Sequence, residues 1–176
     1  MANTSFSFHF LAEEDRIALS FEHATSPVPL PPVLLTRRLV KKLGNHLRHF
    51  IEQHTTLPES VSFEDKGDVL QFMHQSELET SQPTWNSGMS SEQTESLQAA
   101  KLVTKIDIQH SRQSVRLLCY KHNVHLISFT LGWKEMHSFL YSLAELSCKA
   151  EWGLECVFDW SGRVANAQGA GQRLFM

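Results

Sequence analysis

The stretch FSFHFLAEEDRIALSF, Phe6–Phe21, contains two runs in which apolar and polar residues alternate. In each run three apolar residues share one parity: Phe6, Phe8 and Phe10, then Ile17, Leu19 and Phe21. Alternation of period two is typical of a strand with one buried and one solvated face, and a short polar break between two such runs is typical of a hairpin. We therefore predict an antiparallel β-hairpin over residues 6–21.

An amphipathic helix is predicted after a proline-rich connector. The connector SPVPLPP, Ser26–Pro32, ends the strand pattern because proline donates no backbone N–H. In LLTRRLVKKLGNHLRHFIEQH, Leu34–His54, apolar residues recur at helical spacing on one side, and Thr36 is a suitable N-cap. The other side carries five cations: Arg37, Arg38, Lys41, Lys42 and Arg48.

The chain changes character between residues 55 and 100, where eight Asp or Glu residues occur with one Lys. DVLQFMHQSELE, Asp68–Glu79, has enough apolar residues for a short helix, whereas Thr80–Glu95 has the composition of a flexible loop. We expect residues 55–100 to form an acidic, partly flexible insertion. Its charge complements the basic helix, so the pattern also allows it to cover that helix.

Strand-like runs return in the second half of the chain: LVTKIDI (Leu102–Ile108), SVRLLCY (Ser114–Tyr120) and VHLISFTL (Val124–Leu131). The turn KHN between the last two indicates a tight hairpin, because Asn123 tolerates a positive φ. A second helix is predicted at Trp133–Trp152 with Gly153 as its C-cap, and one more strand at Leu154–Trp160.

The order of these elements predicts an α+β fold. The expected architecture is an antiparallel β-sheet built from two hairpin-then-helix halves, with the helices packed on one face. A chain of 176 residues fits one domain. We expect a single domain over residues 1–160 that contains the insertion at 55–100, followed by a flexible tail at 161–176.

The composition argues against several classes of function. A net charge of −3 gives no global attraction to nucleic acid or anionic membrane, and no apolar run approaches the roughly 20 residues that span a bilayer. The N-terminus MANTSFSFHF lacks the basic and apolar regions of a signal peptide. The three cysteines, Cys119, Cys148 and Cys156, are compatible with a reducing compartment. We expect a cytoplasmic protein that does not bind membranes.

No motif for catalysis, a cofactor or a metal is present. The sequence has no Gly-x-Ser-x-Gly and no phosphate-binding glycine loop. Cys119, His122 and His125 have a zinc-like spacing, but a tight hairpin places Cys119 and His125 on opposite faces, where they cannot share an ion. We predict no catalytic residue, no cofactor and no metal site. An enzyme without a recognisable motif stays an alternative.

The second predicted helix carries aromatic residues away from its apolar stripe. Tyr141 and Trp152 fall on the side of the helix opposite that stripe, and Trp133 is the first residue of the helix. Exposed Trp and Tyr side chains are enriched at interfaces. We predict a non-catalytic interaction or self-association module that binds a protein partner or a second copy through Tyr141, Trp152 and Trp133. The pattern leaves open that another segment of the chain covers these residues.

The basic face at residues 36–54 indicates a second surface. Arg37, Arg38, Lys41, Lys42 and Arg48 would supply the phosphate contacts of a nucleic-acid binder. No aromatic residue stands among these cations to stack on bases, and the neighbouring acidic segment competes for the same face. Nucleic-acid binding is therefore the alternative, and a solvated helix face is the simpler interpretation.

Overall fold

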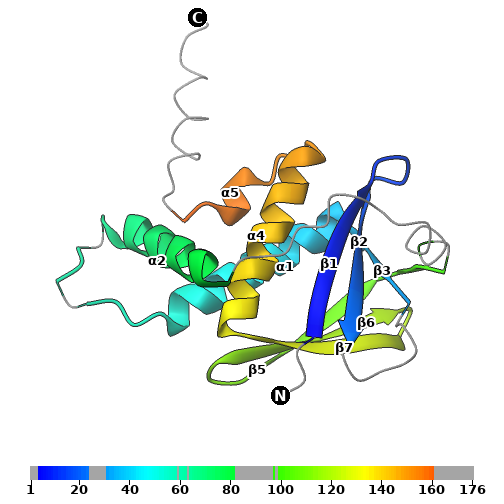
Figure 1. Cartoon of the computed structure of the whole chain (residues 1–176), viewed down its shortest axis with the longest axis horizontal. Coiled ribbons are helices and arrows are strands. Elements are labelled where there is room, and N and C mark those ends of the chain that lie inside the picture. The colour runs from blue at the N-terminus through cyan, green and yellow to red at the C-terminus, as the bar shows by residue number, and fades with distance from the viewer. Residues whose placement is uncertain are drawn as a thin grey trace, which may run out of the picture. The chain divides into compact units, whose positions relative to one another are not determined.

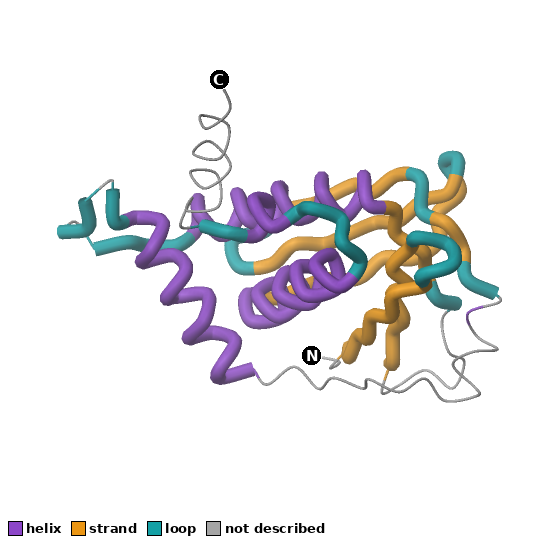
Figure 2. Tube along the Cα trace, turned by 90° about the horizontal axis from the view of Figure 1, so that it is seen from above, coloured by secondary structure: helices purple, strands orange, loops and turns teal. Residues whose placement is uncertain are grey.

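The structure is a computed structural model that describes residues 4–23, 31–58, 60–62, 64–81, 97 and 99–160. The chain divides into two compact units, each built from two stretches of sequence. Unit 1 comprises residues 1–40 and 83–131, and unit 2 comprises residues 41–82 and 132–176. Both strands and helices are present, so the predicted α+β class is confirmed (Figures 1 and 2). A single domain over residues 1–160 stays a prediction.

The described part of unit 1 contains a four-stranded sheet with the order β1-β2-β3-β4. β1 (Thr4–Leu11) and β2 (Arg16–His23) form the predicted antiparallel hairpin. β2 also pairs antiparallel with β3 (Val33–Thr36), which the sequence pattern did not predict. β3 then pairs in parallel with β4 (Lys101–Leu102), which lies far away in the sequence.

The described strands of unit 1 also form a three-stranded sheet with the order β5-β6-β7. Its strands are β5 (Lys105–His110), β6 (Ser114–Lys121) and β7 (Val124–Gly132). His122 and Asn123 join the last two strands with φ angles of 46° and 70°, as a two-residue hairpin turn of the mirror-image type requires. The predicted tight hairpin is therefore present.

The strands lie in two sheets, where the sequence pattern predicted one. The predicted strand Leu102–Ile108 is divided between them. Val103 donates its backbone N–H to the carbonyl of Leu34, whereas the next residue, Thr104, donates its N–H to the carbonyl of Tyr120. The chain therefore passes from one sheet to the other within two residues, and periodicity cannot reveal such a change of partner.

The first helix, α1 (Arg37–His54), begins where the sequence predicts. The hydroxyl oxygen of Thr36 accepts a hydrogen bond from the backbone N–H of Leu39 at 3.3 Å, which is the geometry of an N-cap. The apolar side of α1 is buried at five positions: Val40, Leu43, Leu47, Phe50 and Ile51. A β-carbon at Gly44 would lie 2.7 Å from the ring of Phe158, so glycine permits a close approach there.

Three more helices are described: α2 (Lys66–Ser81), α4 (Trp133–Lys149) and α5 (Glu155–Phe158). The helix predicted in the acidic insertion is therefore present as α2. The strand predicted at Leu154–Trp160 is wrong, because its centre forms the short helix α5. None of the described helices is long and apolar enough to cross a membrane. Residues 26–30, 82–95 and 161–176 of the predicted connector, loop and tail lie outside the described residues.

The helix α4 ends three residues before the predicted terminus at Trp152. Glu151 takes a positive φ of 53° directly after the helix, and the predicted cap residue Gly153 takes a positive φ of 61° two residues later. The N–H of Glu151 donates to the carbonyl of Cys148, and the N–H of Trp152 donates to the carbonyl of Ser147, both at 3.0 Å. This pair of bonds is a Schellman motif, which turns the chain out of the helix before Trp152.

Candidate functional site on helices α2 and α4

Helix α2 carries apolar side chains on two sides, and one of them packs on α4. Leu70, His74 and Leu78 recur every four residues and share the inner side. Leu70 and His74 are buried and Leu78 is half-buried. α2 and α4 are in contact within unit 2, so this side accounts for the attachment of α2.

The opposite side of α2 is apolar and exposed at Phe72 and Met73, and Val69 beside them is half-buried. Val69, Phe72 and Met73 follow the spacing i, i+3, i+4 and form what we call the α2 apolar surface. Phe72 is 71% exposed and Met73 is 36% exposed. Among the described residues, the only other exposed large apolar side chain is Val124 in unit 1, at 65%. An exposed aromatic residue beside an exposed Met is unusual on a solvated helix.

Two buried histidines connect α2 to α4. His74 Nδ1 lies 2.6 Å from His137 Nδ1, a distance at which one nitrogen donates and the other accepts. Burial lowers the pKa of His74 to about 3, with a further contribution from repulsion by His137. Burial also lowers the pKa of His137 to about 4. Both rings are therefore neutral at pH 7, and the shared hydrogen bond requires that one Nδ1 carries a proton and the other does not.

Two tryptophans surround the histidine pair. The ring of Trp160 lies edge-on to His74 with centroids 4.5 Å apart, and Trp133 lies edge-on to His137 at 5.2 Å. His137 Nε2 and Trp160 Nε1 are buried without a hydrogen-bond partner. The surroundings of the pair are therefore largely aromatic, and this accounts for the strong lowering of both pKa values.

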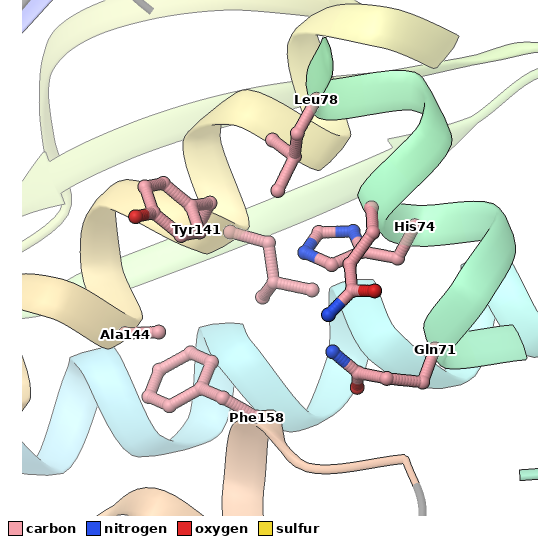
Figure 3. A pocket seen from close by; sticks show the side chains of 8 residues that line it. Gln71, His74, Leu78, Tyr141, Ala144 and Phe158 are labelled. Atoms are coloured by element: carbon pink, nitrogen blue, oxygen red, sulfur yellow. The ribbon is translucent and has the colours of Figure 1, made fainter. Parts of the chain in front are cut away.

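A pocket of about 160 Å³ lies beside His74, between α2, α4 and α5 (Figure 3). Its lining is Gln71, His74, Gln75, Leu78, Leu140, Tyr141, Ala144 and Phe158. None of these lining residues is an Asp, Glu, Lys or Arg. Figure 3 shows the side chains of Gln71 and His74 extending from α2 toward Phe158 and Tyr141. Gln71 Oε1 is buried and has no hydrogen-bond partner.

The three aromatic residues predicted to bind a partner lie in different surroundings. Tyr141 is half-buried and lines the pocket. Trp133 is half-buried and contacts His137. Trp152 is only 2% exposed, because the Schellman turn directs the chain away from the helix face on which a continuous helix would place it. Trp152 is therefore a core residue in this structure, and the chain itself covers it.

The five predicted cations of α1 divide into two groups. Arg37, Arg38, Lys41 and Lys42 are exposed, and no ion pair to another described residue involves them; we call these four residues the α1 basic surface. Arg48 instead lies 3.3 Å from Glu52 and donates from Nη1 to the carbonyls of Cys156 and Asp159. Its guanidinium holds the end of α5 against α1, which is a structural role.

The described residues show no metal-binding group of three or more His, Cys, Asp or Glu side chains. Cys119 is buried, and burial raises the pKa of its thiol to about 12, so its thiolate is not available at neutral pH. Comparison of the chain with protein-family models, with curated proteins and with solved structures found no match.

Sequence reasoning did not identify the histidine pair or the pocket. His74 and His137 are 63 residues apart, and no spacing rule connects them. One signal was present within α2: His74 stands midway between Leu70 and Leu78 on the inner side of a helix. A histidine in that position is expected to be buried with a polar partner, although the sequence does not say which one.

Proposed function

We propose that this chain is a non-catalytic self-association module, in which the α2 apolar surface of one copy contacts the α1 basic surface of a second copy. The observation that carries the proposal is the 71% exposure of Phe72, next to Met73, on a helix whose other side already packs on α4. Burying a Phe side chain contributes about 1.5–3 kcal/mol, so this surface is a ready source of binding free energy.

Charge favours a second copy as the occupant. Exposed carboxylates flank the α2 apolar surface at Glu64, Asp68 and Glu79. The α1 basic surface supplies four exposed cations in its first two turns. Lys and Arg stems cover apolar area while their charged groups reach neighbouring carboxylates, and a cation above the ring of Phe72 adds a favourable electrostatic contact. A two-fold dimer would form this contact twice.

The test is the self-association of purified full-length protein, measured by sedimentation velocity over a range of protein concentrations. We expect a dimer that dissociates as salt is raised from 0.1 to 1 M, because the contact pairs opposite charges. Phe72→Ser should weaken the dimer at least about tenfold, which corresponds to about 1.4 kcal/mol. Val124→Ser removes an apolar side chain of similar exposure, 65%, from unit 1 and should leave the dimer unchanged.

Two results would contradict the proposal. The first is a monomer at every concentration up to about 1 mM, beyond which a dimer would be too weak to be specific. The second is a dimer that Phe72→Ser and Val124→Ser weaken equally, which would show that general loss of apolar surface, rather than loss of the α2 apolar surface, weakens the dimer.

A cytoplasmic location belongs to the same proposal and is supported by the three free cysteines.

Nucleic-acid binding is the second candidate, and the α1 basic surface is the observation that favours it. Its four cations have no ion-pair partner among the described residues. The two functions differ in their dependence on Phe72. Binding of a DNA duplex should weaken with Lys41→Glu and with salt but should be unaffected by Phe72→Ser. If Lys41→Glu weakens binding of the duplex and leaves self-association unchanged, nucleic-acid binding is favoured over the proposed dimer contact.

A further inference from the structure

The pocket beside His74 has the size and chemistry of a binding site that self-association does not use. Its volume of about 160 Å³ is close to that of an engineered protein cavity of roughly 150 Å³ that binds benzene. The pocket therefore accommodates one six-membered ring. Tyr141 and Phe158 supply aromatic walls, and Leu78 and Leu140 supply aliphatic ones.

The polar groups of the pocket select the charge of a ligand. The lining contains no carboxylate, ammonium or guanidinium group. His74, which is 6% exposed, is neutral at pH 7 because burial, with a further contribution from repulsion by His137, lowers its pKa to about 3. A charged ligand would lose its hydration without gaining an opposite charge. The ligand is therefore neutral.

One polar group in the pocket lacks a partner. Gln71 extends toward the pocket with its amide nitrogen on the pocket side, whereas its Oε1 lies away from the pocket and is buried without a hydrogen bond. A half-turn of the amide brings the oxygen to the pocket side, where a ligand that donates a hydrogen bond would satisfy it. A hydroxyl group both donates and accepts, so it satisfies the amide of Gln71 in either of the amide's two orientations.

We infer that the pocket binds a neutral phenol ring, with the phenol hydroxyl hydrogen-bonded to Gln71 and the ring between Tyr141 and Phe158. The ring belongs either to a small phenolic molecule or to a tyrosine side chain of another protein, and the chemistry of recognition is the same for both. Since no residue of the α2 apolar surface lines the pocket, this site can be tested independently of self-association.

The test is binding of 4-methylphenol to the full-length protein, followed by chemical shifts of backbone amides on α2 and α4. We expect a Kd on the order of 0.1–1 mM, as is usual for a ligand of this size in a partly open pocket. Toluene, which has the same shape but no hydroxyl, should bind about tenfold more weakly. N-acetyl-tyrosinamide binding as tightly as 4-methylphenol would assign the ring to a protein tyrosine, and much weaker binding would assign it to a free phenol.

Two variants and one matched control test the contact between the ligand and the pocket. Gln71→Leu keeps the size of the side chain and should reduce the affinity for 4-methylphenol about tenfold without changing that for toluene. Gln109→Leu, at an exposed position of β5, is the matched control and should have no effect. Ala144→Phe places a ring in the pocket and should abolish binding of both compounds. No shifts on α2 and α4 at 5 mM 4-methylphenol, or equal affinity of wild type and Gln71→Leu, would overturn the inference.

Discussion

Helices α1 and α2 differ in how much of their apolar surface the fold buries. α1 has one apolar side, and that side is buried at Val40, Leu43, Leu47, Phe50 and Ile51, while its basic side faces solvent. α2 has two apolar sides, of which one packs on α4 through a pair of histidines and the other remains exposed. When a helix has one apolar side, packing within the chain can bury all of it. When a helix has two apolar sides, the second stays exposed and is available to a partner.

The largest expected effect concerns the inner side of α2. The pKa values of His74 and His137 are lowered to about 3 and about 4, from 6.5 in the unfolded chain, so below pH 6.5 the unfolded state binds more protons than the folded state. The stabilisation is complete above pH 6.5 and is lost as pH falls toward about 4 for His137 and about 3 for His74. From pH 7 to pH 5 the two groups together should lower the free energy of unfolding by roughly 4 kcal/mol.

Urea unfolding at pH 7 and pH 5 measures this effect, and hydrogen exchange locates it. Amides of α2 should exchange faster at pH 5, after correction for the intrinsic rate, than amides of α1. A His74→Gln, His137→Gln double variant serves as the control, because it removes both titrating groups and should lose most of the pH dependence. If wild type and the double variant show the same pH dependence, the histidine pair does not control the attachment of α2.

The next effect concerns the buried side of α1. Leu47 is 0% exposed, and Leu47→Ala should lower the free energy of unfolding by about 2–5 kcal/mol, because it removes buried apolar contacts and leaves a cavity. Asn45→Ala, on the exposed side of the same helix, should change it by less than about 0.5 kcal/mol. If urea unfolding shows that Leu47→Ala and Asn45→Ala lower the free energy of unfolding equally, the two sides of α1 do not differ in burial as described.

A smaller effect is expected at Arg48. Arg48→Met keeps the length of the side chain but removes the donors to the carbonyls of Cys156 and Asp159. The free energy of unfolding should fall by about 1–2 kcal/mol, and amides of α5 should lose protection from hydrogen exchange. Lys41→Met removes an exposed cation from the same helix and is the matched control. Equal effects of the two variants would assign Arg48 to the solvated basic face.

The smallest effect on stability is expected at the α2 apolar surface. Phe72→Ser should change the free energy of unfolding by less than about 0.5 kcal/mol when measured at a low protein concentration, because its side chain is already 71% exposed. The same substitution is expected to have a large effect on self-association. A loss of more than 2 kcal/mol would mean that Phe72 is part of the folded core, and it would remove the basis of the comparison between the two helices.

The sequence predicted α1 better than any other element, for a physical reason. Its apolar residues repeat at helical spacing over five turns, and Thr36 marks its start, so local signals agree with the fold. The hairpin of β1 and β2 was equally predictable, because strict alternation and a polar turn give both strands and their pairing. The α+β class follows from these two elements alone.

The predictions that were incomplete or wrong concern segments whose local structure depends on another segment that is distant in the sequence. β3 is a strand because β2 and β4 pair with it, and β4 lies more than 60 residues away. Trp152 was predicted on the surface because the helix was expected to continue to Trp152, whereas the positive φ of Glu151 turns the chain out of the helix earlier, and no sequence signal predicts a positive φ at a glutamate. The pocket brings α2, α4 and α5 together, and no local signal connects Gln71 with Tyr141 and Phe158.

The central claim is that the exposed side of α2 binds the basic side of α1 in a second copy, and a mixing experiment tests it most directly. Phe72→Ser removes the first surface and keeps the second, whereas Lys41→Glu with Lys42→Glu does the reverse. Each variant alone should be a monomer by native mass spectrometry, and an equimolar mixture should form a heterodimer through the one intact contact. A mixture that stays monomeric, while the wild type dimerises, would contradict the claim.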